Sequence, residues 1–211
     1  MENELKIAEL IGFFIGDGFA GKYGNHTMIQ FVGNPKEEKE YYYNFLAPLI
    51  DEIFSDAKPH FKERNRGLVL YYYSKNMYER FVNDWGLPSG RKSYTVKIPG
   101  FLLQNNETIR CVIRGIFDAE GTVFWDKRKV YKNPYPRLSI QISNKELSIQ
   151  LYELLKSLNF RPCWRLKKLR KRYKNRAEAY FVELYGESNL KKWVKEIYFS
   201  NNKHIRRLMP H

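Results

Sequence analysis

A segment of 13 residues occurs twice in the chain, and this repetition restricts the possible folds more than any other sequence feature. ELIGFFIGDGFAG (9–21) and VIRGIFDAEGTVF (112–124) match at a constant offset of 103 in two glycines, a phenylalanine and an acid. In this match Asp17 corresponds to Glu120. Self-similarity at a fixed offset is typical of internal duplication. The sequence therefore predicts two related halves, each beginning with one of these segments.

Both halves continue with the same order of predicted elements. Two extended stretches lead to a polar pair that can begin a helix, Asn34-Pro35 in the first half and Asn144-Lys145 in the second. Two further extended stretches and a short helix follow, at 76–85 and about 187–198. This order predicts an α+β fold of two pseudo-symmetric αββαββα repeats. The predicted repeats are 1–86 and 107–211, and the turn-rich segment 87–106 is the predicted linker.

Positive charge is concentrated in the second half. The net charge is +14, yet residues 1–105 contain 13 Lys/Arg and 13 Asp/Glu, so residues 106–211 carry the whole excess. The segment 161–176 holds nine Lys/Arg and no acid. Trp164, Leu166 and Leu169 interrupt it, so part of it is expected to pack on a core; the alternative is a solvated hairpin. Such a charge favours a polyanion, most often nucleic acid, as the partner.

Composition excludes several other classes of protein. At 43% hydrophobic and 16% aromatic residues, the chain can bury a core, which excludes general disorder. No stretch is long and apolar enough for a membrane span, and the N-terminal region lacks the pattern of a secretory signal. Two cysteines form no disulfide framework or zinc-binding spacing. We expect an intracellular protein without membrane contact, in the cytoplasm or nucleoid or in an organelle of a eukaryote.

Two predicted strands present polar rows. In RLSIQISN (137–144), polar residues alternate with Leu138, Ile140 and Ile142. KPHFKER (58–64) places basic residues on alternate positions in the same way. Such a row is often only exposed to solvent, but two rows in a basic protein favour contact with DNA.

Small residues in the repeated segments predict a close helix pair. Gly12 and Gly16 lie four residues apart on one helical face, and Gly115 and Ala119 do the same. This spacing allows two helix backbones to approach more closely than the usual roughly 8–10 Å. We therefore expect the two repeated helices to pack through these faces.

Such packing would bring Asp17 and Glu120 together where the two helices end. Acids are unfavourable at a helix C-terminus, and two of them repel each other. A divalent cation would explain their position, because Mg²⁺ binds carboxylate, water and phosphate oxygens. The alternative is two ordinary exposed acids. Gly18 and Gly121 are expected to let the chain leave each helix with unusual backbone angles.

The two segments resemble a known pair of motifs. LIGFFIGDG (10–18) and IRGIFDAEG (113–121) are similar to the motifs of the LAGLIDADG homing endonucleases in their single-chain, two-repeat, intron-encoded form, and the resemblance covers nearly the whole chain. It implies a saddle-shaped antiparallel sheet with packed helices in each repeat, joined through the paired motif helices. It also implies a monomer that cleaves double-stranded DNA at a long asymmetric target, with Mg²⁺, leaving short 3′ overhangs and promoting intron mobility.

The resemblance assigns roles to individual residues. Asp17 and Glu120 would bind two or more Mg²⁺ ions, for which Mn²⁺ may substitute, with Gly16 and Ala119 as further metal-binding positions. Asn34 and Asn144 would orient water, Lys22 and Lys127 are candidates for an active-site lysine, and Asp118 is interpreted as structural. The residues expected to contact DNA are Lys58, His60, Lys62, Arg64, Arg128, Arg137, Ser139 and Gln141 in the major groove, and Arg165 and Lys167 at phosphates.

Other functions are compatible with the same features. One is an RNA-binding maturase acting on intron RNA, and another is a catalytically inactive DNA-binding protein, which the retention of both acids disfavours. A third is an intein-embedded endonuclease; the Met1 start and the absence of a terminal His-Asn pair favour a free-standing protein instead. The least specific alternative is a basic, duplicated α+β binding protein.

Overall fold

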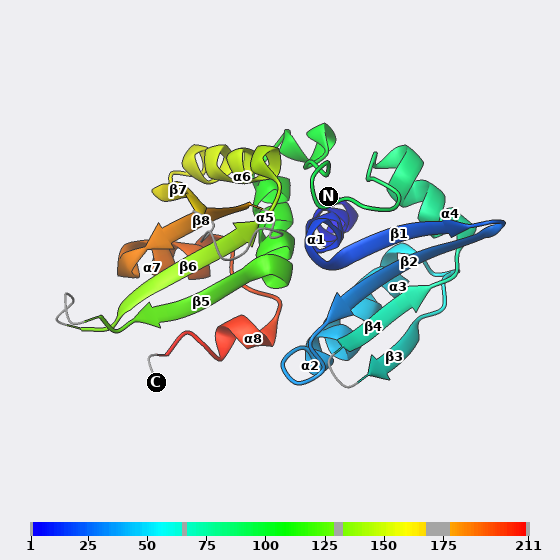
Figure 1. Cartoon of the computed structure of the whole chain (residues 1–211), viewed down its shortest axis with the longest axis horizontal. Coiled ribbons are helices and arrows are strands. Elements are labelled where there is room, and N and C mark those ends of the chain that lie inside the picture. The colour runs from blue at the N-terminus through cyan, green and yellow to red at the C-terminus, as the bar shows by residue number, and fades with distance from the viewer. Residues whose placement is uncertain (1, 65–66, 129–132, 168–177, 210–211) are drawn as a thin grey trace.

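Two helices that carry the repeated segments run side by side through the middle of the molecule. The computed structural model describes residues 2–64, 67–128, 133–167 and 178–209. Helix α1 (Glu2–Asp17) and helix α5 (Asn106–Glu120) form the centre, and one antiparallel sheet lies on each side of them (Figure 1). The predicted α+β fold of two αββαββα repeats is confirmed.

Each half contains a four-stranded antiparallel sheet. Sheet A has the order β1-β2-β4-β3, and sheet B has the equivalent order β5-β6-β8-β7. The strands of sheet A are β1 (Gly18–Tyr23), β2 (His26–Gly33), β3 (His60–Arg64) and β4 (Gly67–Tyr72). The strands of sheet B are β5 (Gly121–Asp126), β6 (Tyr135–Ile142), β7 (Pro162–Lys167) and β8 (Ala179–Tyr185).

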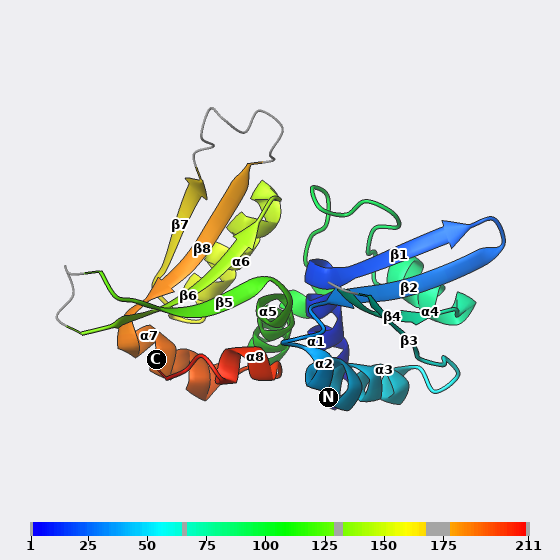
Figure 2. The ribbon, with the colours of Figure 1, turned by 60° about the horizontal axis from the view of Figure 1, so that its bottom comes forward.

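The remaining helices leave one face of each sheet uncovered. Figure 2 shows α2, α3, α7 and α8 gathered on one side of the strands. We call the opposite side the open face. The first half contains α2 (Lys39–Tyr41), η1 (Tyr42–Leu46), α3 (Ala47–Ile53), α4 (Lys75–Glu79) and η2 (Arg80–Asp84). The rest of the chain contains η3 (Gly100–Leu103), α6 (Lys145–Ser157), α7 (Gly186–Glu196) and α8 (Asn202–Ile205).

Strand alternation separates the core from the open face. Ile29, Phe31, Leu68 and Leu70 are fully buried against the helices, and the residues between them point to the open face. The predicted dry row of β6 is confirmed, since Leu138, Ile140 and Ile142 are all buried. Ser139, predicted on the wet face, is nevertheless 5% exposed. It is flanked on that face by Thr122 and Glu183, its partners in the two neighbouring strands.

Some predicted element boundaries were wrong. Asn34-Pro35 does not begin a helix, because the carbonyl of Asn34 first accepts from Glu37 and Glu38 in a turn, and α2 starts at Lys39. Asn144 does cap α6, with its side chain accepting from the amide of Leu147. The strand expected from residue 58 begins at His60, so Lys58 lies ahead of it.

The basic run is only partly described. Its first part forms β7, and residues 168–177, including Leu169, lie outside the described residues. Trp164 packs on the core as expected and donates from its indole to Ser148 at 2.9 Å. Leu166, in contrast, is 41% exposed.

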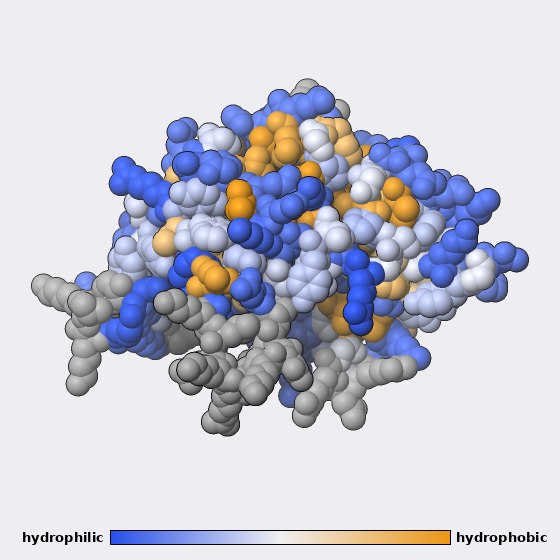
Figure 3. All heavy atoms as spheres, turned by 45° about the horizontal axis from the view of Figure 1, so that its top comes forward, coloured by the Kyte–Doolittle hydropathy of each residue, from blue (hydrophilic) through white to orange (hydrophobic). Residues whose placement is uncertain are grey.

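The visible surface is mainly hydrophilic. In Figure 3, hydrophobic residues form small separate groups among hydrophilic ones. Among the described residues, no helix has both the length and the apolar character needed to cross a membrane.

The predicted close contact of α1 and α5 is confirmed. A methyl group added to Gly12 would lie against the backbone carbonyl of Val112, and one added to Gly115 would meet the carbonyl of Glu9. A methyl group on Gly16 would meet the side chain of Ala119. The helices therefore touch backbone to backbone along the predicted faces.

The two glycines that follow the helices have a different role from the predicted one. Neither Gly18 nor Gly121 has a positive φ, and Gly121 is extended at φ −84° and ψ 163°. A side chain on Gly18 would collide with Phe14, and one on Gly121 would collide with Phe117. Glycine is needed here because an aromatic ring covers the start of each strand.

We predict that Gly115→Ala destabilises the protein. Helix propensity alone would favour alanine by about 1 kcal/mol. The added methyl group would instead collide with two backbone atoms of α1, the Glu9 carbonyl oxygen and the Phe13 nitrogen. We expect the free energy of unfolding, measured in urea, to fall by about 2 kcal/mol or more. Gly100→Ala is the control, because nothing lies within 4 Å of its added methyl group. Equal stability of both variants would contradict this packing.

Candidate active site at the paired helix ends

The close helix contact brings the two motif acids together. Asp17 ends α1 and Glu120 ends α5, and a methyl group on Gly16 would lie 3.0 Å from the Cγ atom of Glu120. The side chain of Asp17 is half-buried, whereas Glu120 is more exposed. Two acids from different halves of the chain thus share one location, as the sequence predicted.

Their surroundings disfavour two negative charges. Loss of hydration, together with the nearby charges of Glu120 and Glu38, raises the pKa of Asp17 to about 7. Loss of hydration also raises the pKa of Glu120, against the opposing effect of Lys92 and Lys203. A bound cation would offset both the dehydration and the repulsion.

Two lysines that the sequence analysis missed lie at this centre. The Nζ atom of Lys92 donates to the carbonyls of Ile15 and Gly16, at 2.7 and 2.6 Å. Burial lowers the pKa of Lys92, while the charges of Glu120 and Asp17 act in the opposite direction.

Lys203 holds the corresponding position at the end of α5. Its Nζ atom donates to the carbonyl of Ala119 at 3.3 Å and pairs with Glu38 at 2.7 Å. Lys92 follows η2 and Lys203 follows α7, the corresponding helices of the two repeats, so the duplication itself could have pointed to them. Gly16 and Ala119, predicted at metal-binding positions, thus direct their carbonyls to lysines.

The structure places the predicted lysines elsewhere. Lys22 lies five residues beyond Asp17 along β1, roughly 16 Å away at about 3.3 Å per residue. It lines a hollow together with Thr27 and Lys75, beside α4. Lys127 follows the far end of β5. Neither residue is brought to the acids.

The two predicted amides differ in their surroundings. Asn34 is exposed and lines the same hollow as Asp17. Asn144 is 2% exposed, donates to the carbonyl of Val96 at 2.7 Å and caps α6, so its amide is already engaged. A second hollow lies on the same side of the helix pair as Asn144, and its lining includes Glu120, Lys92 and Gln141.

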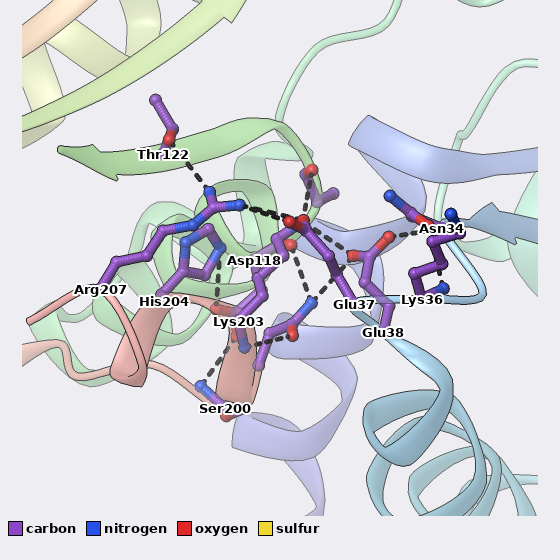
Figure 4. Close-up of polar contacts among 12 residues, drawn as sticks. Asn34, Lys36, Glu37, Glu38, Asp118, Thr122, Ser200, Lys203, His204 and Arg207 are labelled. Atoms are coloured by element: carbon purple, nitrogen blue, oxygen red, sulfur yellow. Dashed lines mark hydrogen bonds and ion pairs between the residues drawn. The ribbon is translucent and has the colours of Figure 1, made fainter.

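The C-terminal segment forms ion pairs and hydrogen bonds with residues next to this centre. Figure 4 shows Lys203 and Arg207 directed at the acids that follow β2. Arg207 pairs with Glu37 at 2.9 Å and donates to Thr122, while Asn201 donates to Glu38. This segment of the second half therefore ties the end of α5 to the first half.

Asp118 lies inside this network, in line with its structural interpretation. It is fully buried and accepts from the backbone amide of Ser200 at 2.9 Å. Burial raises its pKa to about 8 and lowers that of the neighbouring His204 to about 3. Both groups favour their neutral forms at this position.

Arginines on the open face of sheet B are held by buried acids. The Nε atom of Arg165 donates to Glu183 at 2.5 Å, and its guanidinium lies 4.1 Å from the ring centre of Phe181. Arg137 pairs with Asp126 at 2.6 Å and lies over a tyrosine ring. Glu183 and Asp126, at 2% and 8% exposure, were not predicted. Strand alternation could have indicated them, because each acid lies at a position whose side chain points to the same face of the sheet as the arginines.

The other predicted DNA contacts are more scattered. His60 and Lys62 are exposed on sheet A, and Gln141 and Lys167 are exposed on sheet B. Arg128 pairs with Asp126 at 2.7 Å. Ser139 is buried, Lys58 precedes its strand, and the side chain of Arg64 lies outside the described residues.

Comparison with known proteins agrees with this architecture. Residues 107–198 match the family model of the LAGLIDADG-like domain. The chain is 29% identical over 210 residues to a replication factor C small subunit of Methanocaldococcus jannaschii, and 30% identical over 207 residues to that of Thermococcus kodakarensis. These alignments cover 97% and 96% of this chain but only 10% and 21% of the relatives, so the chain spans a small part of the relatives' length.

Solved structures share the fold. One comes from a study of mesophilic variants of the homing endonuclease I-DmoI. It superimposes on this chain with a TM-score of 0.67 at 20% identity, and the match covers 94% of this chain and 97% of that chain. I-WcaI bound to its DNA recognition sequence superimposes with a TM-score of 0.58 at 14% identity, covering 99% and 87%. At these identities the likeness shows a common two-repeat fold.

We predict that Asp17→Asn changes how stability depends on pH. Without divalent cations, the unfolded chain loses the Asp17 proton near its ordinary pKa of 3.8, whereas the folded protein keeps it up to about pH 7. The free energy of unfolding of the parent protein therefore falls as pH rises through this window. Near pH 4 both proteins should be similar, and above pH 7 the variant should be more stable by about 1–3 kcal/mol.

Urea unfolding in EDTA between pH 4 and pH 8 measures this difference. Excess Mg²⁺ should reduce it, because a ligand bound only by the folded parent stabilises that protein. A difference that is constant with pH would contradict the raised pKa.

Proposed function

We propose that the chain is a site-specific endonuclease of double-stranded DNA, similar to the LAGLIDADG proteins whose family model matches residues 107–198 and whose fold it shares. The observation that carries the proposal is the pair of acids, one from each repeat, held together by backbone contact and flanked by one lysine each. A DNA-binding protein without activity would not need this costly juxtaposition of two acids.

We propose Mg²⁺ as the cofactor. The residues fit such an ion: Asp17 and Glu120 supply hard oxygen ligands, and their raised pKa values favour a cation. Among the described residues no cluster of three or more metal-binding side chains occurs, so water and phosphate oxygens would complete the coordination. A bound ion would stabilise the attacking hydroxide and the leaving oxygen. Solved I-DmoI complexes contain DNA with Mn, Ca or Mg, which supports a divalent ion.

The residues of this chain would position the reacting groups. Asp17 and Glu120 would each serve one strand of the duplex, and Lys92 would add positive charge beside the scissile phosphate. Asn34, exposed next to Asp17, remains a candidate for orienting water. Asn144 would instead fix the linker through Val96.

DNA would lie across the open faces of both sheets. The structural neighbour I-WcaI was solved bound to its DNA recognition sequence, which supports DNA as the partner. The excess charge of residues 106–211 would provide most of the attraction to phosphates. Because the halves differ in sequence, the target would be asymmetric and a monomer would suffice. Short 3′ overhangs and promotion of intron mobility complete the proposal.

We predict that Asp17→Asn and Glu120→Gln abolish cleavage but not binding. Both changes keep the size of the side chain and remove the charge that would hold the metal. Each should lower the cleavage rate by orders of magnitude, since the metal contributes several kcal/mol and about 1.4 kcal/mol corresponds to tenfold. The measurement is cleavage of a supercoiled plasmid carrying the target, with binding followed in Ca²⁺. Parent-like linearisation by both variants would place the active site elsewhere.

We predict unequal effects for the two lysines. Glu38 neutralises Lys203, whereas Lys92 contacts carbonyl oxygens and, among the described residues, has no such close carboxylate partner. Lys92→Met should therefore slow cleavage about 100-fold, and Lys203→Met about tenfold or less. Nicked plasmid should accumulate with Lys92→Met if each lysine serves one strand. Thermal unfolding of both variants checks that the helix ends remain folded. Equal rate losses would argue against the asymmetry.

A further inference from the structure

The open face of sheet A is aromatic and apolar. Residues that are paired across neighbouring strands point to the same face of the sheet. The residues of the open face are those that alternate along each strand with the buried residues, which include Ile29, Phe31, Leu68 and Leu70. None of the described side chains on this face is acidic. The register places two basic residues on it, Lys62 and Arg64, both in the edge strand β3. Besides Arg64, the face consists of Phe19, Gly21, Tyr23, His26, Met28, Gln30, Val32, His60, Lys62, Val69, Tyr71 and, just past β4, Tyr73.

These side chains are accessible and grouped. Tyr23, Val32 and Tyr73 are 61%, 43% and 64% exposed. Tyr71 stacks on His60 with ring centres 5.2 Å apart and meets Tyr73 edge-on at 5.4 Å. A hollow lined by Tyr23, His26, Met28 and Tyr73 lies near the outer end of the face. An exposed apolar group of this kind usually marks a binding surface.

Sheet B presents a different chemistry on its open face. Arg137 and Arg165 lie there, each over an aromatic ring and each paired with a buried acid; the side chain of Arg165 is 47% exposed and that of Arg137 is 14% exposed. Their planar guanidinium groups suit the O6 and N7 acceptors of guanine. The two halves therefore offer DNA two unlike surfaces.

We propose that the half of the DNA target under sheet A is recognised mainly through the methyl groups of thymine. This inference rests on the proposed endonuclease function. The face continues along β2 through Gln30 and Val32 to Asn34, beside Asp17. A duplex cut at the acids must therefore extend across it.

The chemistry of the major groove selects thymine. The C5-methyl group of thymine is the apolar group on the base edges of that groove. A G·C pair would place its hydrogen-bond donors and acceptors against aromatic rings, which cannot form hydrogen bonds with all of them. A buried polar group without a hydrogen-bond partner is costly. The half-site under sheet A should be rich in A·T pairs, whereas the half-site under sheet B should contain guanines at the positions of Arg137 and Arg165.

The first experiment identifies the target and its halves. A randomised duplex library is incubated with the full chain and Mg²⁺, and cleaved sequences are selected. Arg137→Ala should relax the preference in one half-site, which marks that half as the one under sheet B. If the parent protein cleaves no sequence, the proposed function fails, and this inference fails with it.

The second experiment tests the methyl groups directly. In the selected duplex, uracil replaces thymine in one half-site at a time, which removes only the methyl groups. Binding in Ca²⁺ should weaken by up to about fourfold for each contacted methyl in the half under sheet A, and change little in the other half. The double variant Tyr23→Ser/Tyr73→Ser should bind the thymine and uracil duplexes equally. Tyr43→Ser is the control, because Tyr43 is exposed on the helical side, stacked on Phe61.

Three outcomes would overturn the inference while leaving the endonuclease intact. The half-site under sheet A could be rich in G·C pairs, or uracil could replace thymine without effect. Alternatively, the double variant could lose affinity for single-stranded oligonucleotides but keep the methyl discrimination on duplex DNA. The last result would make this face a stacking surface for single strands.

Discussion

The contact between the backbones of α1 and α5 determines the rest of the structure. Because Gly12 and Gly115 have no side chains, nothing at these positions holds the two helices apart. At this separation the two helix ends meet, and so do the acids that end them. The sheets then start from Gly18 and Gly121, directly beyond the acids. The position of the candidate active site is thus a consequence of helix packing, and any added volume between the helices would separate the acids.

The same contact creates an electrostatic problem that the chain resolves unequally in its two halves. Helix C-termini and carboxylates bring negative charge to one dehydrated location. Lys92 and Lys203 each donate to the final carbonyls of one helix, which offsets that charge. Only Lys203 is also paired with a buried acid, Glu38, through a network that the C-terminal segment completes. The two helix ends, although they correspond in the repeats, are therefore chemically different.

The sequence was sufficient for features that repeat or alternate. The duplicated segments predicted the helix contact and the paired acids, and the alternation in β6 predicted its buried row. It was insufficient where tertiary contacts decide. Lys92 lies in a segment that was interpreted as a linker. It is 76 residues away from Gly16 in the sequence, and only the folded chain brings the two into contact. Lys22 was a candidate for the active-site lysine that the resemblance implies, yet an extended strand carries it away from Asp17. Asn34 resembled a helix cap, but a turn precedes the helix.

The helix contact and the open faces of the sheets are under different physical constraints. A substitution at the helix contact collides with backbone and is costly, so both repeats retain small residues there. A substitution on an open strand face changes only what that face can bind. The open face of sheet A carries the ring cluster of His60, Tyr71 and Tyr73, whereas that of sheet B carries arginines that lie over aromatic rings and are held by Asp126 and Glu183. Two divergent repeats thus place one pair of acids between two unlike open faces, which a symmetric dimer of identical halves could not provide.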